Sequence, residues 1–284
     1  MLLKKTEIKL GLPEPLKVMH ISDSHFCLAD ERDGQRKIEL AGLRIKYHFG
    51  DSHEAIERNI DEQIAYGKAN CDLIVHTGDI IDFRSIPNLE IMRRKLEYAD
   101  AFYAVGSHEF SLYIGEAEED TAYKMQSWDM ISASSLNALD FAVRIVKGVR
   151  FISMDNSYYR FTPEQIAALK EELQNEMPTV ICVHTPLFEE EFFHRRLKDT
   201  GNNYTSLVAT PDKYRIHYPE NQIERQKPDE ATWAMYHLIT TTPQIKAVLA
   251  GHLHDFYEVT LPGGAVQICG CAGYENEAVE VTFV

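Results

Sequence analysis

Aspartate and histidine residues fall into five short blocks along this sequence of 284 residues. In chain order the blocks are Asp23-Ser24-His25, Gly78-Asp79-Ile80-Ile81-Asp82, Gly106-Ser107-His108-Glu109, the isolated His184, and Gly251-His252-Leu253-His254. Carboxylate and imidazole ligands together suit Zn, Mn or Fe better than Ca or Mg. The blocks contain no thiolate ligand, which argues against a structural zinc site. These residue types therefore predict a centre for transition-metal ions.

Each block follows a short apolar run rich in valine and isoleucine, which is typical of a buried strand. The predicted strands cover residues 17–22, 72–77, 101–105, 180–184 and 247–250. Open α/β sheets gather their ligand sites at the carboxyl ends of their strands, where these blocks lie. Alternate residues, as in Asp-x-His, can point to the same side. His20 and His76 lie inside the runs, and we interpret them as buried structural histidines that are hydrogen-bonded to the backbone.

Helical patterns separate the predicted strands and favour an α/β core. Residues 52–68 carry isoleucine every four residues, and Asp51 with Glu54 resembles a capping box. A second helix is expected to begin after Thr162, with Thr162 and Gln165 in the N-cap and N3 positions of a capping box and Pro163 at the first helical position. Residues 142–154 and 256–284 are expected to form hairpin-connected strands, so the predicted sheets are mixed.

Two polar segments, 26–50 and 188–227, lack a sustained period, and we interpret them as insertions over the site. No repeat or linker divides the sequence, so residues 1–284 are expected to form one domain.

Four of the basic residues in or beside these segments are considered for the substrate pocket. His48 and His53 are interpreted as solvated loop residues, with a place in the substrate pocket as the alternative. Arg195 and Arg196 are candidates for binding a substrate phosphate, because guanidinium groups suit phosphate oxygens. The alternative for both arginines is an exposed helix face.

The composition excludes several classes of protein. Acidic residues outnumber basic ones by 44 to 29, and the formal net charge of -15 disfavours nonspecific nucleic-acid binding. Residues 1–16 lack the features of a signal peptide, and no apolar run is long enough to span a membrane. The five cysteines form no CxxC pair and are expected to be reduced. We expect a cytoplasmic protein without a membrane partner.

In content and order, the five blocks resemble the motifs of the calcineurin-like metallophosphoesterases: Asp-x-His, Gly-Asp-x-x-Asp, Gly-Asn-His-Asp/Glu, an isolated His and Gly-His-x-His. The blocks run from Asp23 to His254, so the resemblance covers nearly the whole chain. It implies an α/β fold, namely the family's four-layered α/β/β/α sandwich with mixed sheets. It also implies a hydrolase that acts on phosphoric esters.

Carried over residue by residue, the resemblance implies a binuclear centre of Mn, Fe or Zn. The implied ligands are Asp23, His25 and His254 for the first ion, His184 and His252 for the second, and Asp79 as the bridge between them. His108 resembles the family histidine that protonates the leaving oxygen or stabilises the transition state. Asp82 would orient a ligand histidine from outside the coordination shell, with a plain turn carboxylate as the alternative.

Ser107 departs from the family pattern, in which an asparagine at this position coordinates the second ion. A serine hydroxyl is shorter and is a poorer neutral ligand, so the second ion would bind more weakly or depend on water or substrate. We keep Ser107 among the expected ligands, and a working binuclear site is expected because the other ligands remain.

The leading hypothesis is hydrolysis of a phosphomonoester or phosphodiester through attack of metal-bound hydroxide on phosphorus. The expected substrate is a small soluble phosphoester, with a nucleotide-like molecule as the preferred example. One alternative is a catalytically degenerate metal-binding or scaffold protein with the same fold, which Ser107 would permit. Another is a metal-dependent hydrolase of a nonphosphate ester.

Overall fold

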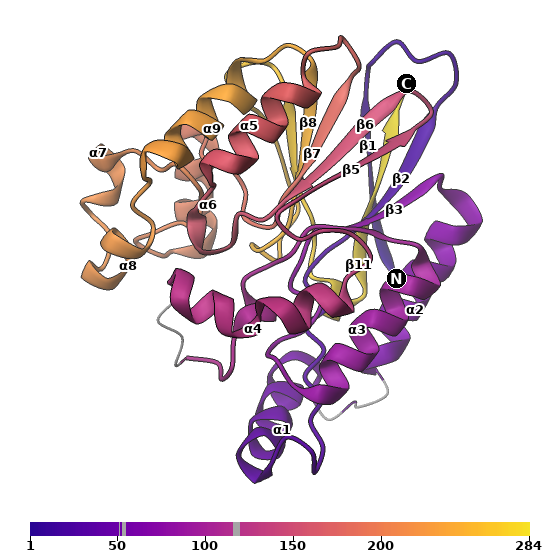
Figure 1. Ribbon diagram of the computed structural model, residues 1–284, viewed down its shortest axis with the longest axis vertical. Helices are drawn as coiled ribbons and strands as arrows, with labels where there is room; N and C mark the ends of the chain where they lie inside the picture. Colours follow the sequence, from indigo (N-terminus) through magenta and orange to yellow (C-terminus); the bar gives the residue numbers. More distant parts are fainter. Residues whose placement is uncertain (51, 53–54, 116–119) are drawn as a thin grey trace.

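Two mixed β-sheets form the centre of the protein, and helices flank their outer faces (Figure 1). The computed structural model describes residues 1–50, 52, 55–115 and 120–284. The five-stranded sheet contains, in spatial order, β1 (Leu2–Ile8), β11 (Glu277–Phe283), β2 (Leu16–Ile21), β3 (Leu73–His76) and β4 (Phe102–Tyr103). The six-stranded sheet contains β5 (Phe141–Val146), β6 (Val149–Met154), β7 (Thr179–Cys182), β8 (Ile245–Ala250), β10 (Val266–Cys269) and β9 (Tyr257–Thr260).

The helices separate into two groups, one beside each sheet (Figure 1). The first group contains α1 (Gln35–Phe49), α2 (Ala55–Asn70), α3 (Ile86–Ala99) and α4 (Thr121–Ser134). The second contains α5 (Pro163–Glu172), α6 (Glu190–Thr200), α7 (Asp212–Arg215), α8 (Glu220–Arg225) and α9 (Glu230–Thr241). Three short 3-10 helices are η1 (His108–Phe110), η2 (Ser157–Tyr159) and η3 (Gly273–Glu275). Within the described ranges, no helix is long and apolar enough to cross a membrane.

Three apolar cores hold the layers together. Strand residues alternate between cores: Val18 packs between the sheets, whereas the neighbouring Met19 packs against the first helix group. Likewise, Phe151 faces the other sheet and Ile152 faces the second helix group. Central strands are therefore buried on both faces, which explains their continuous apolar runs. The arrangement is the predicted α/β/β/α sandwich.

Parallel pairing places the site at one edge of each sheet. β2, β3 and β4 run parallel to one another, as do β7 and β8, so the carboxyl ends of each set lie together. These are the five strands predicted from the apolar runs. The structure also confirms the buried isoleucines of α2 and the capping box formed by Thr162 and Gln165. The capping box proposed for Asp51 and Glu54 lies outside the described residues.

Three expectations about the elements need correction. β1 was not predicted, and β11 does not extend the 256–284 hairpin but crosses into the five-stranded sheet. The segments expected to be irregular contain helices: α1 lies within 26–50, and α6 to α8 lie within 188–227. α1 begins after Gly34 without a side-chain cap, so its sequence lacks the usual signal for a helix start.

Candidate metal centre

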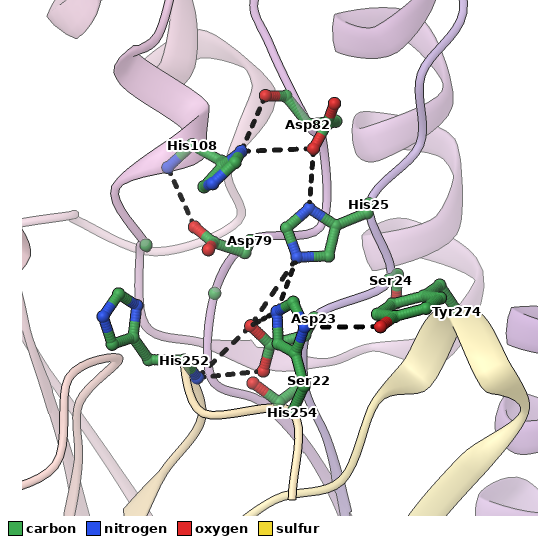
Figure 2. Close-up of polar contacts among 12 residues, drawn as sticks. Ser22, Asp23, Ser24, His25, Asp79, Asp82, His108, His252, His254 and Tyr274 are labelled. Atoms are coloured by element: carbon green, nitrogen blue, oxygen red, sulfur yellow. Dashed lines mark hydrogen bonds and ion pairs between the residues drawn. The ribbon is translucent and has the colours of Figure 1, made fainter. Parts of the chain in front are cut away.

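The loops that follow β2, β3, β4, β7 and β8 bring the five Asp/His blocks together. Figure 2 shows residues from four of these blocks, those of Asp23, Asp79, His108 and His252. The expected ligand residues form two groups, each with one carboxylate and two imidazoles. Asp23, His25 and His254 form the first group, and Asp79, His184 and His252 form the second. In both groups the ligand atoms lie within 4.8 Å of one another. Both groups draw on both sheets, because histidines from the six-stranded sheet meet aspartates from the five-stranded sheet.

Five of these six residues have a left-handed backbone, with φ between 47° and 71°: Asp23, His25, Asp79, His252 and His254. Positive φ is uncommon outside glycine and costs of order 1 kcal/mol or more per residue. Such strain persists only where the surrounding structure imposes it, and it is concentrated at functional sites. The backbone is therefore sharply bent at five of the six candidate ligands.

The first group converges through two ring nitrogens. His25 Nε2 lies 3.0 Å from His254 Nε2, and these atoms lie 3.8 and 3.3 Å from Asp23 Oδ1. Two imidazole nitrogens so close together need a shared proton or a cation between them. Asp23 is held from the other side by the His252 amide, which donates to its carboxylate at 3.0 and 3.2 Å.

The second group converges in the same way. His184 Nε2 lies 3.0 Å from Asp79 Oδ2 and 3.1 Å from His252 Nδ1. His184 Nδ1 donates to the Thr77 carbonyl at 2.7 Å, because a carbonyl can only accept. In neutral His184 the Nε2 lone pair must then face Asp79 and His252, which is the tautomer that a metal ligand requires.

Electrostatics keep both aspartates ionised. Burial alone would raise the pKa of Asp23, but His254 and His184 hold it below its usual range. Burial likewise raises the pKa of Asp79, and His184 and His108 outweigh that effect. In the opposite direction, burial lowers the pKa of His25 to about 4. Burial lowers the pKa of His184, but Asp79 outweighs it and raises the pKa to about 9, so a bound ion would displace the His184 proton. Ionised carboxylates beside imidazole form the donor set that a divalent transition metal needs.

Two tyrosines approach the outer nitrogens of the Gly-His-x-His histidines. Tyr159 Oη lies 3.4 Å from His252 Nε2, and Tyr274 Oη lies 3.4 Å from His254 Nδ1. The inner nitrogens of these histidines are the ones that face the two ligand groups. Partners of this kind orient ligand imidazoles. Sequence reasoning did not single out either tyrosine, because both come from loops distant from the motif in the sequence.

Glu109 supports the loop that carries Asp79. Its buried carboxylate accepts from the amides of Asp79, Ile80 and Gly106 at 3.1, 2.6 and 3.0 Å. Burial and the nearby Asp79 raise the pKa of Glu109 to about 7. The family motif places Asp or Glu at this position, which was the signal that could have identified it. Gly106 is needed for a different reason: a Cβ there would collide with the Asp79 carboxylate.

His108 lies beside both Asp79 and Asp82 (Figure 2). Its backbone amide donates to Asp79 Oδ1 at 2.8 Å. Its Nδ1 donates to the Asp82 carbonyl at 2.9 Å and lies 3.2 Å from Asp82 Oδ1. Burial lowers the pKa of His108, but Asp79 and Asp82 outweigh it and raise the pKa to about 10. The side chain is 27% exposed, so a protonated ring can face a ligand in the site.

Asp82 contacts His25 as well as His108. His25 Nδ1 lies 2.9 Å from Asp82 Oδ1, which supports the expected orienting role. His48 also lies 3.1 Å from this oxygen, and it is buried on α1. The interpretation of His48 as a solvated loop residue is therefore wrong, because α1 packs it against the site. His53 lies outside the described residues.

The other expected residues lie as follows. Ser107 is half-buried at the start of η1, between Gly106 and His108. Arg196 pairs with Asp255 at 2.5 Å and donates to the Leu253 carbonyl at 3.1 Å, so it braces the loop that bears the last two ligand histidines.

Arg195 lies over the Tyr257 ring, at 4.7 Å from its centroid. A phosphate contact for either Arg195 or Arg196 remains a prediction. His20 and His76 are buried, as expected. Their partners are only in part the expected backbone groups: His20 bonds the Thr77 hydroxyl, and His76 bonds the Ser24 hydroxyl as well as the Gly78 amide.

Comparison with known proteins places this geometry in a family. The sequence pattern of the calcineurin-like phosphoesterases matches residues 16–256, whereas no curated protein sequence matches significantly. The chain is similar to the structure of a dimetal phosphatase from Danio rerio, at 13% identity and a TM-score of 0.52, over 92% of this chain and 89% of that one. It is also similar to a purple acid phosphatase from yellow lupin (Lupinus luteus) seeds, at 12% identity and a TM-score of 0.53, over 93% of this chain and 45% of that one.

At such low identities, these two structural similarities show the fold alone. The family pattern, by contrast, spans most of the sequence and contains all five Asp/His blocks. The chain belongs to the calcineurin-like phosphoesterase family.

Proposed function

We propose that this protein hydrolyses a phosphomonoester or phosphodiester at a binuclear metal centre. The observation that carries the proposal is the pair of ligand groups, each with one carboxylate and two imidazoles, formed where the two sheets meet. Family membership supports the reaction class. The name of the similar dimetal phosphatase is consistent with two ions.

Each ion would be held by one of the two groups. Asp23, His25 and His254 would bind the first ion; Asp79, His184 and His252 would bind the second. We further propose that Asp79 bridges the ions and that Ser107 contributes weakly to the second. Two bound ions of Mn, Fe or Zn would neutralise charge on the phosphoryl group and acidify the attacking water.

The proposed role of His108 is to protonate the leaving group. As the bond from phosphorus to the leaving oxygen breaks, its electron pair stays on that oxygen, which takes a proton from His108 Nε2. His108 Nδ1 keeps its hydrogen bond to the Asp82 carbonyl throughout, so the ring does not rotate. The nearby Asp79 and Asp82 carboxylates favour the protonated ring before the reaction.

The substrate that we propose is a small soluble phosphoester, and nucleic acid is disfavoured by the net charge of -15. A nucleotide-like substrate is the finer proposal. Tyr274, which is half-buried and lies 5.2 Å from His254 between ring centroids, is the aromatic ring available near the first group for stacking. We also propose a cytoplasmic location, which the five free cysteines favour.

Ser107 is the observation that favours a second candidate, a degenerate metal-binding scaffold. A hydroxyl in place of the family amide could leave the second ion too weakly bound for catalysis. Under this alternative the protein would hold one ion or none and would turn over no phosphoester.

The decisive experiment is elemental analysis of protein purified without chelator, together with hydrolysis of aryl phosphate mono- and diesters in added Mn²⁺. We expect about two ions per chain and turnover, and the monoester to diester ratio would define the substrate class. A matched pair of variants localises the activity: His108→Ala should abolish most turnover, whereas the exposed His217→Ala should not. Metal-poor protein that stays inactive with Mn²⁺ would favour the scaffold.

A further inference from the structure

Asp82 is the most heavily shared side chain beside the metal centre. Its carboxylate is fully buried and receives Arg44 as a two-point contact, Nε to Oδ2 at 2.5 Å and Nη2 to Oδ1 at 3.0 Å. On the other side lie His25 Nδ1 and His108 Nδ1, at 2.9 and 3.2 Å from Oδ1. A single carboxylate thus joins a candidate metal ligand, the candidate proton donor and an arginine from a different element. Figure 2 shows Asp82 between the two histidines.

The arginine comes from α1, in the segment interpreted as an insertion. Arg44 and His48 are one helical turn apart, so both point from α1 towards Asp82. The His48 ring stacks on His25, with centroids 4.6 Å apart and an angle of 14° between the planes. α1 therefore covers one face of a candidate metal ligand and grips the carboxylate that orients it.

Arg44 also determines whether the side chains around Asp82 can bind a metal ion. His25, His48 and Asp82 are close enough to hold a third cation. The guanidinium already occupies the carboxylate and would repel such an ion, so the cluster is complete without a metal. Burial favours neutral Asp82, but hydrogen bonds led by His108, with His25, His48 and Arg44, hold its pKa well below the usual range. Arg44 thus helps to keep a buried charge that would otherwise be costly.

We propose that Arg44 is a positioning residue for the reaction, acting through Asp82 on both His25 and His108. The inference rests on the proposed function. Two parallel contacts fix the plane of a carboxylate, whereas a single contact lets it rotate. Rotation of the Asp82 carboxylate would release the His25 ring from the first metal group and would move the negative charge away from His108 Nδ1, while the hydrogen bond from His108 to the Asp82 carbonyl remains. Correct docking of α1 is therefore part of the catalytic geometry.

The test compares three variants in the full chain. Arg44→Gln removes the charge, Arg44→Lys keeps the charge without the two-point contact, and Lys46→Gln is the control on the exposed side of the same helix. Arg44→Gln should lower kcat about 10- to 100-fold, the range found when partners of metal ligands are removed. The loss should be larger for phenyl phosphate than for 4-nitrophenyl phosphate, because the poorer leaving group depends more on a proton donor. The kcat of Arg44→Lys should lie between those of Arg44→Gln and the wild type, and the kcat of Lys46→Gln should equal that of the wild type.

A double variant separates positioning from a merely structural role. If Arg44 acts through His108, Arg44→Gln in a His108→Ala background should no longer change the ratio of the two substrates. Two results would overturn the proposal. One is an equal loss of kcat for phenyl phosphate and 4-nitrophenyl phosphate in Arg44→Gln; the other is that Arg44→Gln changes the ratio of the two kcat values as much in the His108→Ala background as in the wild type. Circular dichroism and thermal unfolding show whether each variant is folded. If Arg44→Gln does not fold, Arg44→Lys, which retains the positive charge, takes its place in the comparison.

Metal binding supplies a readout that does not depend on turnover. Titration with Mn²⁺ alone should show that Arg44→Gln weakens binding of one ion about tenfold or more, because His25 loses its fixed orientation. Unchanged Mn²⁺ affinity in a folded Arg44→Gln protein would overturn the action on His25. If the wild type binds Mn²⁺ but hydrolyses no phosphoester, the proposed function fails while this comparison still tests the role of Arg44.

Discussion

Asp79 is the residue at which the two candidate ligand groups are coupled. One carboxylate oxygen lies 3.0 Å from His184 Nε2, and the other accepts from the His108 amide at 2.8 Å. Although burial raises its pKa, histidines of both groups, His184 and His25, act together with His108 to lower it. A single carboxylate influenced by both groups is suited to bridging two ions.

Replacing Asp79 should therefore affect both ions at once. Asp79→Asn keeps the size of the side chain but removes its charge. We therefore expect the affinity for each ion to fall more than about 100-fold, which exceeds the loss caused by removing a hydrogen-bond partner of a metal ligand. His108→Ala should instead keep both ions and lower kcat about 10²- to 10⁴-fold. Elemental analysis and kinetics on the same samples distinguish the two. Retention of one tightly bound ion by Asp79→Asn would show that Asp79 does not bridge.

Ser107 offers the opposite test, a gain of binding. Ser107→Asn supplies the amide oxygen of the family motif next to Gly106 and His108, so the more weakly bound ion should bind about tenfold more tightly, or ~1.4 kcal/mol. Competition with a chelator of known affinity measures the change, and Ser111→Asn serves as a control after η1. An unchanged affinity would place Ser107 outside the coordination shell.

At the scale of elements, the loop after β4 must approach the loop after β3 very closely. Gly106 contacts Asp79 so tightly that a Cβ would overlap the carboxylate and the Asp79 amide. Glu109 then ties the two loops together through three backbone amides. The geometry of Asp79 therefore depends on the absence of a side chain on another loop.

Gly106→Ala should displace Asp79 and reduce metal content, with a loss of stability of about 1–3 kcal/mol from overpacking. Gly42→Ala on α1 is the control, because a Cβ there meets no atom within 4 Å and alanine favours the helix by up to ~1 kcal/mol. Urea unfolding and elemental analysis test both variants. Normal metal content in Gly106→Ala would mean that the loop can move without losing the site.

Elements that bury apolar residues on both faces could be predicted from the sequence, and elements at the surface could not. The five strands that precede the Asp/His blocks were found because apolar residues run almost continuously through them. β1 was missed because it is an edge strand whose Lys4 and Lys5 are exposed, so its apolar residues form no run. α1 was missed because it begins without a side-chain cap and because its buried residues, Ala41, Ile45 and His48, include a single large apolar side chain.

The same difference applies to the site. The motifs predicted the residues that the structure gathers in the two ligand groups, because each lies a fixed number of residues after a recognisable strand. Arg44, Tyr159 and Tyr274 lie in no such register. Their places depend on how α1, η2 and η3 pack in three dimensions, and no spacing in the sequence encodes that packing.

At the scale of the whole molecule, buried neutral histidines should make stability depend on pH. Burial lowers the pKa of His20 from its usual 6.5 to about 4, and burial lowers that of His76 to about 3. The unfolded chain therefore binds more protons than the folded one below about pH 6.5. The stability contributed by neutral His20 and His76 should be fully present above that pH and should fall on acidification, with the His20 share, on the order of 3 kcal/mol, lost by about pH 4.

Urea midpoints between pH 7 and pH 4 test this dependence, in chelator so that loss of metal does not contribute. His20→Gln can still bond Thr77 but carries no proton, so its stability should fall less steeply than that of the wild type. His217→Gln, at an exposed position, should follow the wild type. Parallel curves for His20→Gln and the wild type would show that His20 does not contribute to the acid sensitivity.

The strand order of the five-stranded sheet determines when this sheet can be completed during synthesis. β11 follows every other strand in the sequence, yet it lies between β1 and β2 and is the pairing partner of β1. The first ligand group is divided in the same way, since Asp23 and His25 emerge early from the ribosome and His254 emerges late. A nascent chain would thus present an open sheet and an incomplete set of ligands for most of its synthesis. Metal acquisition should therefore be one of the last events in the biogenesis of this protein, after β11 has closed the sheet.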